Sequence, residues 1–129
     1  KIMKQIKDGK QTLYIVNDKD GTPTYTHDFA ANVNLLINNN ACGLFNMVCD
    51  GLTSRLDVAR ELLSLLKIDN KINIIEVDSK HFAEEYFAER PDNERLINKR
   101  LNELSLNIMR NWRVALREYI KEYYKGYFI

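Results

Sequence analysis

Two arginines, Arg90 and Arg95, lie five residues apart on a segment that contains a proline, residues 89–96 (ERPDNERL). The planar guanidinium group of arginine can donate two parallel hydrogen bonds to the oxygens of one phosphate. Spacing alone leaves a second interpretation open, in which both arginines form surface salt bridges with the neighbouring glutamates. The pattern therefore indicates either phosphate recognition or a solvated, charged loop.

Hydroxyl groups are concentrated in a second segment, residues 21–30 (GTPTYTHDFA), which holds Thr22, Thr24, Tyr25 and Thr26. This segment follows a predicted strand and precedes a predicted helix. Ligand-binding groups in α/β folds are commonly placed where strands end. The same residues also suit a turn followed by a helix cap. The segment is therefore a candidate for ligand contact, with the turn as its alternative.

Several kinds of chemistry lack their residues in this sequence. The five glycines do not form the G-x-G-x-x-G or P-loop patterns that hold nucleotide phosphates. No tyrosine is followed four residues later by lysine, the pair that short-chain reductases use for hydride transfer. His27 and His81 lie far apart, without cysteines at zinc-binding spacing. We therefore expect no catalytic residue, no cofactor-binding residue and no metal ligand in this chain.

The elements that must position these residues alternate between helix and strand. In the segment that begins at Asp28 and ends at Asn38, four residues lie on one helix face and are expected to be buried: Phe29, Val33, Leu36 and Ile37. We expect helices at residues 1–9, 28–38, 54–66, 98–104 and 111–123, and strands at residues 12–16, 43–48 and 72–77. Residues 78–96 are expected to form a long loop with short elements. The alternation predicts an α/β fold with a small sheet flanked by helices.

Composition narrows the class of protein. A chain of 129 residues has the size of one domain, and 45% of its residues are hydrophobic. Nineteen basic and 18 acidic side chains give a net charge of +1, which provides no electrostatic case for nucleic acid or a membrane surface. Cys42 and Cys49 are too few for a disulfide scaffold, and we expect two buried, reduced thiols. These observations favour the cytoplasm.

Five segments, taken together in their order along the chain, resemble the C-terminal half of dTDP-4-dehydrorhamnose reductases, a branch of the extended short-chain dehydrogenases. Residues 21–30 resemble the family pattern G-[ST]-P-T-Y-T-x-D-L-A, and residues 89–96 are similar to R-P-x-N-S-x-L-D. Residues 43–48, 54–62 and 106–119 resemble its G-x-[YF]-[HN]-x-[VA] strand, its S-x-x-[DE]-[FV]-A-x-E-[IL] helix and its closing L-x-[LI]-x-x-W-x-x-A-L-R-x-Y-[IL] segment.

The resemblance implies a two-part enzyme. Its N-terminal Rossmann half would bind NADPH or NADH and carry the catalytic Tyr and Lys, and it would be absent from residues 1–129, which would form a single substrate-binding domain. The activity would be interconversion of dTDP-4-dehydro-6-deoxy-L-mannose and dTDP-L-rhamnose. Arg90 lies where the family places a phosphate-contacting arginine, with Asn93 beside it. Thr22, Thr24 and Tyr25 are weaker substrate-contact candidates.

Further expectations concern partners and the residues around the site. Asp28 should steady the start of its helix rather than contact substrate. The partners implied are the dTDP-sugar and the N-terminal Rossmann domain, and exposed apolar surface makes a homodimer possible. On its own, residues 1–129 should not catalyse reduction.

The sequence departs from the family pattern in two places, and two alternatives stay open. Glu94 replaces the serine of the second motif and Ile97 its aspartate, which puts the nucleotide contacts in doubt. Related epimerases and dehydratases carry an R-D-[YW] motif where this chain has Gly21, which favours the reductases. The alternatives are a domain of another sugar-nucleotide epimerase or dehydratase, and a non-catalytic subunit such as the regulatory subunit of methionine adenosyltransferase.

Overall fold

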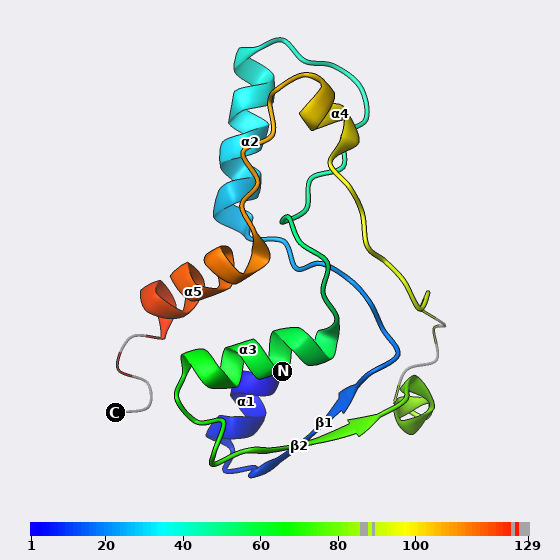
Figure 1. Ribbon diagram of the computed structural model, residues 1–129, viewed down its shortest axis with the longest axis vertical. Helices are drawn as coiled ribbons and strands as arrows, with labels where there is room; N and C mark the ends of the chain where they lie inside the picture. Colours follow the sequence, from blue (N-terminus) through cyan, green and yellow to red (C-terminus); the bar gives the residue numbers. More distant parts are fainter. Residues whose placement is uncertain (86–87, 89, 125, 127–129) are drawn as a thin grey trace. The chain divides into compact units, whose positions relative to one another are not determined.

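The computed structural model describes residues 1–85, 88, 90–124 and 126. The chain divides into two compact units. Unit 1 comprises residues 1–21, 53–94 and 126–129, and unit 2 comprises residues 22–52 and 95–125. The elements follow the order α1 (Ile2–Lys7), β1 (Thr12–Val16), α2 (Thr26–Asn38), α3 (Arg55–Leu65), β2 (Asn73–Val77), η1 (Ser79–Phe82), α4 (Lys99–Glu103) and α5 (Trp112–Tyr123) (Figure 1).

Unit 1 is built on a two-stranded parallel sheet. β1 pairs with β2 in a register that aligns Thr12 with Asn73 and Val16 with Val77. α3 lies between the two strands in sequence and packs against β1 (Figure 1). The helical spacing of Leu56, Ala59, Leu62, Leu63 and Leu66 predicts that these side chains face inward, and all five are buried. With Leu13, Ile15 and Val16 of β1 they form the core of unit 1. The prediction of an α/β fold with a small sheet flanked by helices is confirmed.

α3 begins where the sequence predicts. The hydroxyl of Ser54 accepts a hydrogen bond from the backbone N–H of Asp57, 3.1 Å away, and so caps the first turn. Asp57 also places a negative charge in that first turn, where the helix dipole favours it. The helix ends at Leu65, and Lys67 adopts a positive φ of 57° beyond it. Ser54 thus fixes where the chain enters the helix that covers the sheet.

Unit 2 consists of α2, α4, α5 and the extended segments between them. Its core is formed by one large aromatic side chain and smaller residues around it: Trp112, Leu36, Cys49, Leu101, Met109, Ala115 and Ile120. The helical spacing in α5 predicts an inward face formed by Trp112, Ala115, Leu116, Tyr119 and Ile120. Of these, Trp112, Ala115 and Ile120 are buried. Leu116, from the same prediction, is half-buried, and Tyr119 is exposed.

The predicted strand at residues 43–48 is wrong. This segment lies in unit 2 and pairs with no strand among the described residues. The side chain of Asn98 accepts a hydrogen bond from the Val48 N–H (2.9 Å) and donates one to the Val48 carbonyl (2.8 Å). A side-chain amide thus replaces the backbone ladder at Val48. The described sheet therefore has two strands where three were predicted.

The predicted buried face of α2 is also wrong. The helix buries Asp28, Asn32 and Leu36, whereas Phe29 is 39% exposed and Ile37 is 67% exposed. Polar residues face inward because backbone groups of residues 106–110 need hydrogen-bond partners there. The sequence predicts Thr26 as the cap of this helix, but Thr26 is the first residue of α2 and Tyr25 is the N-cap residue.

The two cysteines differ in environment. Cys49 is buried, as predicted, and burial raises the pKa of its thiol. Cys42 is exposed, so the prediction of two buried thiols is wrong for Cys42. Cys42 lies directly before residues 43–48, in a stretch that forms no strand, so its side chain has no sheet to pack against. Among the described residues, the helices are too short or too polar to cross a membrane.

Candidate functional site

The segment that carries Arg90 is held against the end of β1 in unit 1. Lys19 lies just beyond that strand and is buried. Its ammonium group donates to the carbonyl of Arg90 at 2.8 Å and to Oδ1 of Asp92 at 2.6 Å. A buried lysine is costly unless its charge is paired and its protons are bonded, and both conditions are met here. Lys19 therefore fixes the backbone from which the Arg90 side chain projects.

Backbone hydrogen bonds add to this anchor. The N–H of Asp20 donates to the Asp92 carbonyl at 2.7 Å, and the N–H of Glu94 donates to the Asp20 carbonyl at 2.9 Å. Asp20 forms a parallel bridge with Asn93 and an antiparallel bridge with Ser54. The chain beyond β1 thus continues as a short ladder with a partner on each side. Asn93 lies within this ladder, three residues from Arg90.

The Arg90 and Asn93 side chains are exposed. Among the described residues, the Arg90 guanidinium has no ion-pair partner. Glu89, one of the glutamates considered above as a partner, lies outside the described residues. An exposed guanidinium on a fixed backbone is preorganised to meet an anion, because only its side-chain freedom is lost on binding.

The start of the long loop in unit 1 is fixed by Asp18. One carboxylate oxygen accepts from the Ser79 N–H at 2.9 Å and from the Ser79 hydroxyl at 2.8 Å. The backbone hydrogen bond from Ser79 is the largest effect that lowers the Asp18 pKa. Nearby, the Tyr14 and His81 rings stack with centroids 5.0 Å apart. Both ends of the loop at residues 78–94 are therefore tied to the exit of β1.

The hydroxyl-rich segment begins unit 2. The Thr22 hydroxyl is half-buried and donates to the Gly51 carbonyl at 3.3 Å, and Thr24 is exposed. Tyr25 is only 8% exposed. Its ring stacks on His27 (5.0 Å between centroids) and meets the edge of Tyr119 (6.5 Å). In this segment Thr24 is exposed, Thr22 is bonded to the neighbouring backbone, and Tyr25 anchors both to the core of unit 2.

A charged network lies beside Tyr25. Both carboxylate oxygens of Asp28 accept from the guanidinium of Arg110, at 2.7 to 3.0 Å. Another nitrogen of the same guanidinium donates to Glu118 at 2.5 Å. The Arg110 guanidinium lies 5.8 Å from the centroid of the Tyr25 ring. Asp28 is engaged within the protein, in agreement with the steadying role expected for it.

The pKa values of this cluster follow from its contacts. Hydrogen bonding to Arg110 is the main reason that the pKa of Glu118 is lowered. Burial is the main reason that the pKa of Tyr25 is raised, and the negative charge of Glu118 raises it further. The paired carboxylates raise the pKa of Arg110. The network therefore favours the charged forms of Glu118 and Arg110 beside a neutral Tyr25.

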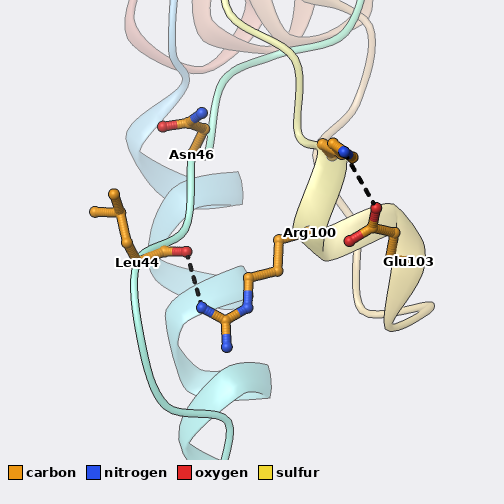
Figure 2. Close-up of a pocket in the computed structure, with 5 residues that line it drawn as sticks. Leu44, Asn46, Arg100 and Glu103 are labelled. Atoms are coloured by element: carbon orange, nitrogen blue, oxygen red, sulfur yellow. Dashed lines mark hydrogen bonds and ion pairs between the residues drawn. The ribbon is translucent and has the colours of Figure 1, made fainter.

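A separate hollow of about 260 Å³ lies on unit 2 and is shown in Figure 2. The described residues that line it are Leu44, Asn46, Lys99, Arg100 and Glu103. Arg100 donates to the Leu44 carbonyl (3.3 Å) and the Cys42 carbonyl (2.8 Å), and Lys99 pairs with Glu103 (3.7 Å). None of the five predicted site residues is among those lining residues. Its cations are engaged within the protein, so we do not assign a ligand to this hollow.

The model of a known protein family, described as "RmlD substrate binding domain", matches residues 1–125 of the chain. The chain belongs to this family. This match confirms the family resemblance of the five sequence segments. It also confirms the expectation that the chain is a substrate-binding domain of this family.

Relatives of this RmlD substrate-binding domain include curated and solved proteins. The spore coat polysaccharide biosynthesis protein SpsK of Bacillus subtilis is 28% identical over 120 residues, which are 93% of the chain and 40% of SpsK. A dTDP-4-dehydrorhamnose reductase from Clostridium acetobutylicum is 31% identical, with a TM-score of 0.86 over 94% of the chain and 42% of that protein. The Yersinia enterocolitica dTDP-4-dehydrorhamnose reductase is 28% identical, with a TM-score of 0.81 over 93% of the chain and 41% of that protein.

A fourth protein shares the fold. The dTDP-4-dehydrorhamnose reductase of Bacillus anthracis, solved in complex with NADP, is 22% identical, with a TM-score of 0.82 over 95% of the chain and 41% of that protein. The chain thus spans about two fifths of the length of these relatives.

The described residues of this RmlD substrate-binding domain do not fit a dinucleotide cofactor. A dinucleotide site needs glycines in the turn between a strand and a helix. Gly9 follows α1, the space beside Gly43 is filled by Arg100, and Gly51 lies against Asn111 and Trp112. None of these three glycines lies in a turn that joins a strand to the start of a helix. Gly21 lies between β1 and α2, but residues 17–25 contain no second or third glycine of a dinucleotide-binding turn. No group of three potential metal-ligating side chains is found in the described part of the chain.

The five predicted site residues of this family member fall in both units. Arg90 and Asn93 belong to unit 1, and Thr22, Thr24 and Tyr25 belong to unit 2. Sequence reasoning missed Lys19 and Arg110, the two cations that hold these segments in place. Neither had a local signal, because Lys19 lies in a polar turn and Arg110 in a segment without motif chemistry. The contact roles of all five predicted residues stay predictions.

Proposed function

We propose that this RmlD substrate-binding domain forms the sugar-nucleotide-binding part of a dTDP-4-dehydrorhamnose reductase. The complete enzyme would interconvert dTDP-4-dehydro-6-deoxy-L-mannose and dTDP-L-rhamnose. Membership of the family over residues 1–125 supports this proposal. So does the similarity to the Clostridium and Yersinia reductases, which share 31% and 28% identity with the chain.

The observation that carries the proposal is the fixed loop with an exposed arginine. Lys19 holds the Arg90 carbonyl and the Asp92 carboxylate, so the Arg90 guanidinium projects from an anchored backbone. In the proposal Arg90 binds the diphosphate of the sugar nucleotide with two parallel hydrogen bonds, and Asn93 adds an amide contact. Thr22, Thr24 and Tyr25 belong to the segment that orients the ligand.

Hydride transfer in this proposal belongs to a second part of the protein. That part would bind NADPH or NADH and carry the catalytic Tyr and Lys, because the described residues here do not fit a dinucleotide. The Bacillus anthracis reductase was solved with NADP, which supports a nicotinamide cofactor in the complete enzyme. Residues 1–129 alone would bind and orient the sugar nucleotide without reducing it, and the cytoplasm is the compartment we propose.

Calorimetric titration of dTDP-L-rhamnose into the complete protein, with NADPH present, tests this function. Arg90→Ala should weaken binding by about 1.5–3 kcal/mol, the worth of a charge-assisted hydrogen bond. Arg60→Ala is the matched control, because Arg60 is an exposed arginine of unit 1 that pairs with Glu76. Wild-type protein that does not bind the nucleotide sugar would refute the proposed function. Equal binding by wild type and Arg90→Ala would remove Arg90 from the site.

A homodimer remains part of the proposal. Exposed apolar side chains in unit 2, among them Ile37, Leu44 and Leu52, offer surface that a second copy could cover. Sedimentation of the complete protein would show a monomer–dimer equilibrium if this is so. A single monomeric species at high protein concentration would contradict it.

A further inference from the structure

The Arg110 network joins three segments of unit 2. Its guanidinium contacts Asp28 in the first turn of α2 and Glu118 in α5. Its backbone N–H donates to Asp28 at 3.4 Å, and its carbonyl accepts from the Asp50 N–H at 2.9 Å. One residue therefore holds the start of α2, the middle of α5 and the segment near Gly51 together.

Tyr25 lies at the centre of these contacts. It is the N-cap residue of α2, but no side-chain cap bond is made there. What holds it is its ring, which meets the Arg110 guanidinium at 5.8 Å, the His27 ring at 5.0 Å and the Tyr119 ring at 6.5 Å. Thr24 precedes it directly, so a change in the Tyr25 backbone moves the exposed Thr24 hydroxyl.

We propose that Arg110 is a positioning residue for substrate binding: by holding Asp28 and Glu118, it keeps the Tyr25 ring in place and so orients the Thr22 and Thr24 hydroxyls for the sugar nucleotide. This inference rests on the proposed function and adds a residue to it. Arg110 need not touch the ligand, and its effect passes through Tyr25.

Charge explains why Arg110 is suited to this role. The Asp28 side chain is 8% exposed and the Arg110 side chain 37% exposed, so their attraction is only partly screened by water. Without Arg110, the carboxylates of Asp28 and Glu118 would repel each other beside the ring. The buried Asp28 would also lose its partner. The expected response is an outward movement of the α2 start that releases Tyr25 into water.

Arg100 provides a matched control. It is also an arginine of unit 2 that holds a segment, since it donates to the Cys42 and Leu44 carbonyls and lies over the Phe45 ring at 4.6 Å. Within the described part of the chain, these contacts of Arg100 lie at residues 42–45, away from residues 22–28. Substitution of either arginine should lower the general stability of unit 2, whereas substitution of Arg110 alone should impair substrate positioning.

The first readout is steady-state kinetics of the complete protein with dTDP-4-dehydro-6-deoxy-L-mannose and NADPH. Arg110→Met should raise KM for the sugar nucleotide about tenfold, because the ligand must then order the segment on binding, and leave KM for NADPH unchanged. Arg110→Lys should recover part of the loss, since an ammonium can pair with one carboxylate but not hold both. Arg100→Met should leave both constants unchanged. Equal sugar-nucleotide KM values for Arg110→Met and wild type would overturn the proposal.

The second readout follows Tyr25 directly by NMR of protein labelled with ¹³C at the tyrosine ring carbon that bears the hydroxyl. Burial is the largest cause of the raised Tyr25 pKa, and the positive charge of Arg110 lowers it slightly. If Arg110→Met releases the ring, the Tyr25 pKa should fall toward its ordinary value of 10.0. If the ring stays in place, loss of the nearby cation should raise the pKa, and the positioning role would be wrong.

The two proposals fail in different ways. Wild-type protein that neither binds nor turns over the sugar nucleotide would refute the proposed function, and with it the substrate role of Arg110. Normal turnover by wild type together with an unmoved Tyr25 signal in the variant would refute the Arg110 proposal alone. Should Arg110→Met not fold, Glu118→Gln weakens the same network and should raise KM for the sugar nucleotide in smaller degree, with KM for NADPH unchanged.

Discussion

The ammonium nitrogen of Lys19 lies 2.6 Å from Oδ1 of Asp92, and this ion pair ties the exit of β1 to the loop that carries Arg90. The lysine is buried and the aspartate is exposed. Lys19 also bonds the Arg90 carbonyl, so two of its protons are satisfied by one short segment. The pair is therefore a fixed point of the candidate site rather than an ordinary surface salt bridge.

Lys19→Met should destabilise the protein by about 1–3 kcal/mol, because the buried aliphatic stem is kept while the Arg90 carbonyl and the Asp92 carboxylate lose their donor. Urea denaturation of wild type and variant measures the difference. Arg60→Met breaks the exposed pair with Glu76 and serves as the control, with an expected cost of about 0–1 kcal/mol. If both variants lost the same free energy of unfolding, the Lys19 contacts would stabilise the protein no more than an exposed ion pair does.

The sequence could point to the loop but not to its anchor. Arg90 and Asn93 lie in a motif whose residue types suggest anion binding. Lys19 is separated from Asp92 by 73 positions and lies in a turn whose composition is typical of solvent-exposed residues. Pairing between distant charges depends on tertiary structure, so no local pattern could have identified it. The same holds for Arg110 and Asp28, 82 positions apart.

Asn98→Ala should cost about 2 kcal/mol or more, because it leaves both the N–H and the carbonyl of Val48 without their partner. Hydrogen exchange at the Val48 amide should quicken, and chemical denaturation should show the loss. Asn102→Ala is the control, since the Asn102 side chain accepts an exposed hydrogen bond from the Asn107 side chain. Unchanged protection of the Val48 amide would contradict this assignment.

The same contact explains the failed strand prediction at residues 43–48. The segment is largely apolar. A strand also needs a neighbouring strand, and a side-chain amide occupies the hydrogen-bonding groups of Val48 instead. The α2 prediction failed for a related reason. Periodicity located the helix to within two residues, but the inward face is set by backbone groups that need polar partners, not by hydrophobicity.

Asn32→Leu tests that reading of α2. Asn32 is fully buried, donates to the Leu106 carbonyl at 3.0 Å and accepts from the Ile108 N–H at 3.0 Å. A leucine would add apolar area but leave both backbone groups unpaired, at an expected cost of about 2–4 kcal/mol in urea denaturation. Asn34→Leu, on the exposed side of α2, should change stability by about 0.5 kcal/mol or less. If Asn32→Leu left the stability unchanged, hydrophobicity rather than hydrogen bonding would determine which face of α2 is buried.

Stability should depend on Asp18 in a pH-dependent way. The hydrogen bond from the Ser79 N–H lowers the Asp18 pKa below its ordinary value of 3.8. A lowered folded-state pKa contributes stability that is fully present above 3.8 and is lost as the pH falls through the folded-state pKa. Asp18→Asn should therefore be destabilising at pH 7, with a difference that narrows in acid below that ordinary value. A difference that stays constant across this range would show that ionisation of Asp18 is not involved.

Gly43→Ala should be destabilising for two separable reasons. Gly43 adopts a φ of +112°, which costs other residues of the order of 1–3 kcal/mol. An added Cβ would also lie 2.3 Å from a guanidinium nitrogen of Arg100, so the contact that holds the Cys42 and Leu44 carbonyls would break. In the background of Arg100→Ala only the backbone cost should remain, and the two substitutions should be non-additive in urea denaturation. Simple additivity would mean that Arg100 moves aside without loss, and that Gly43 is required by its backbone conformation alone.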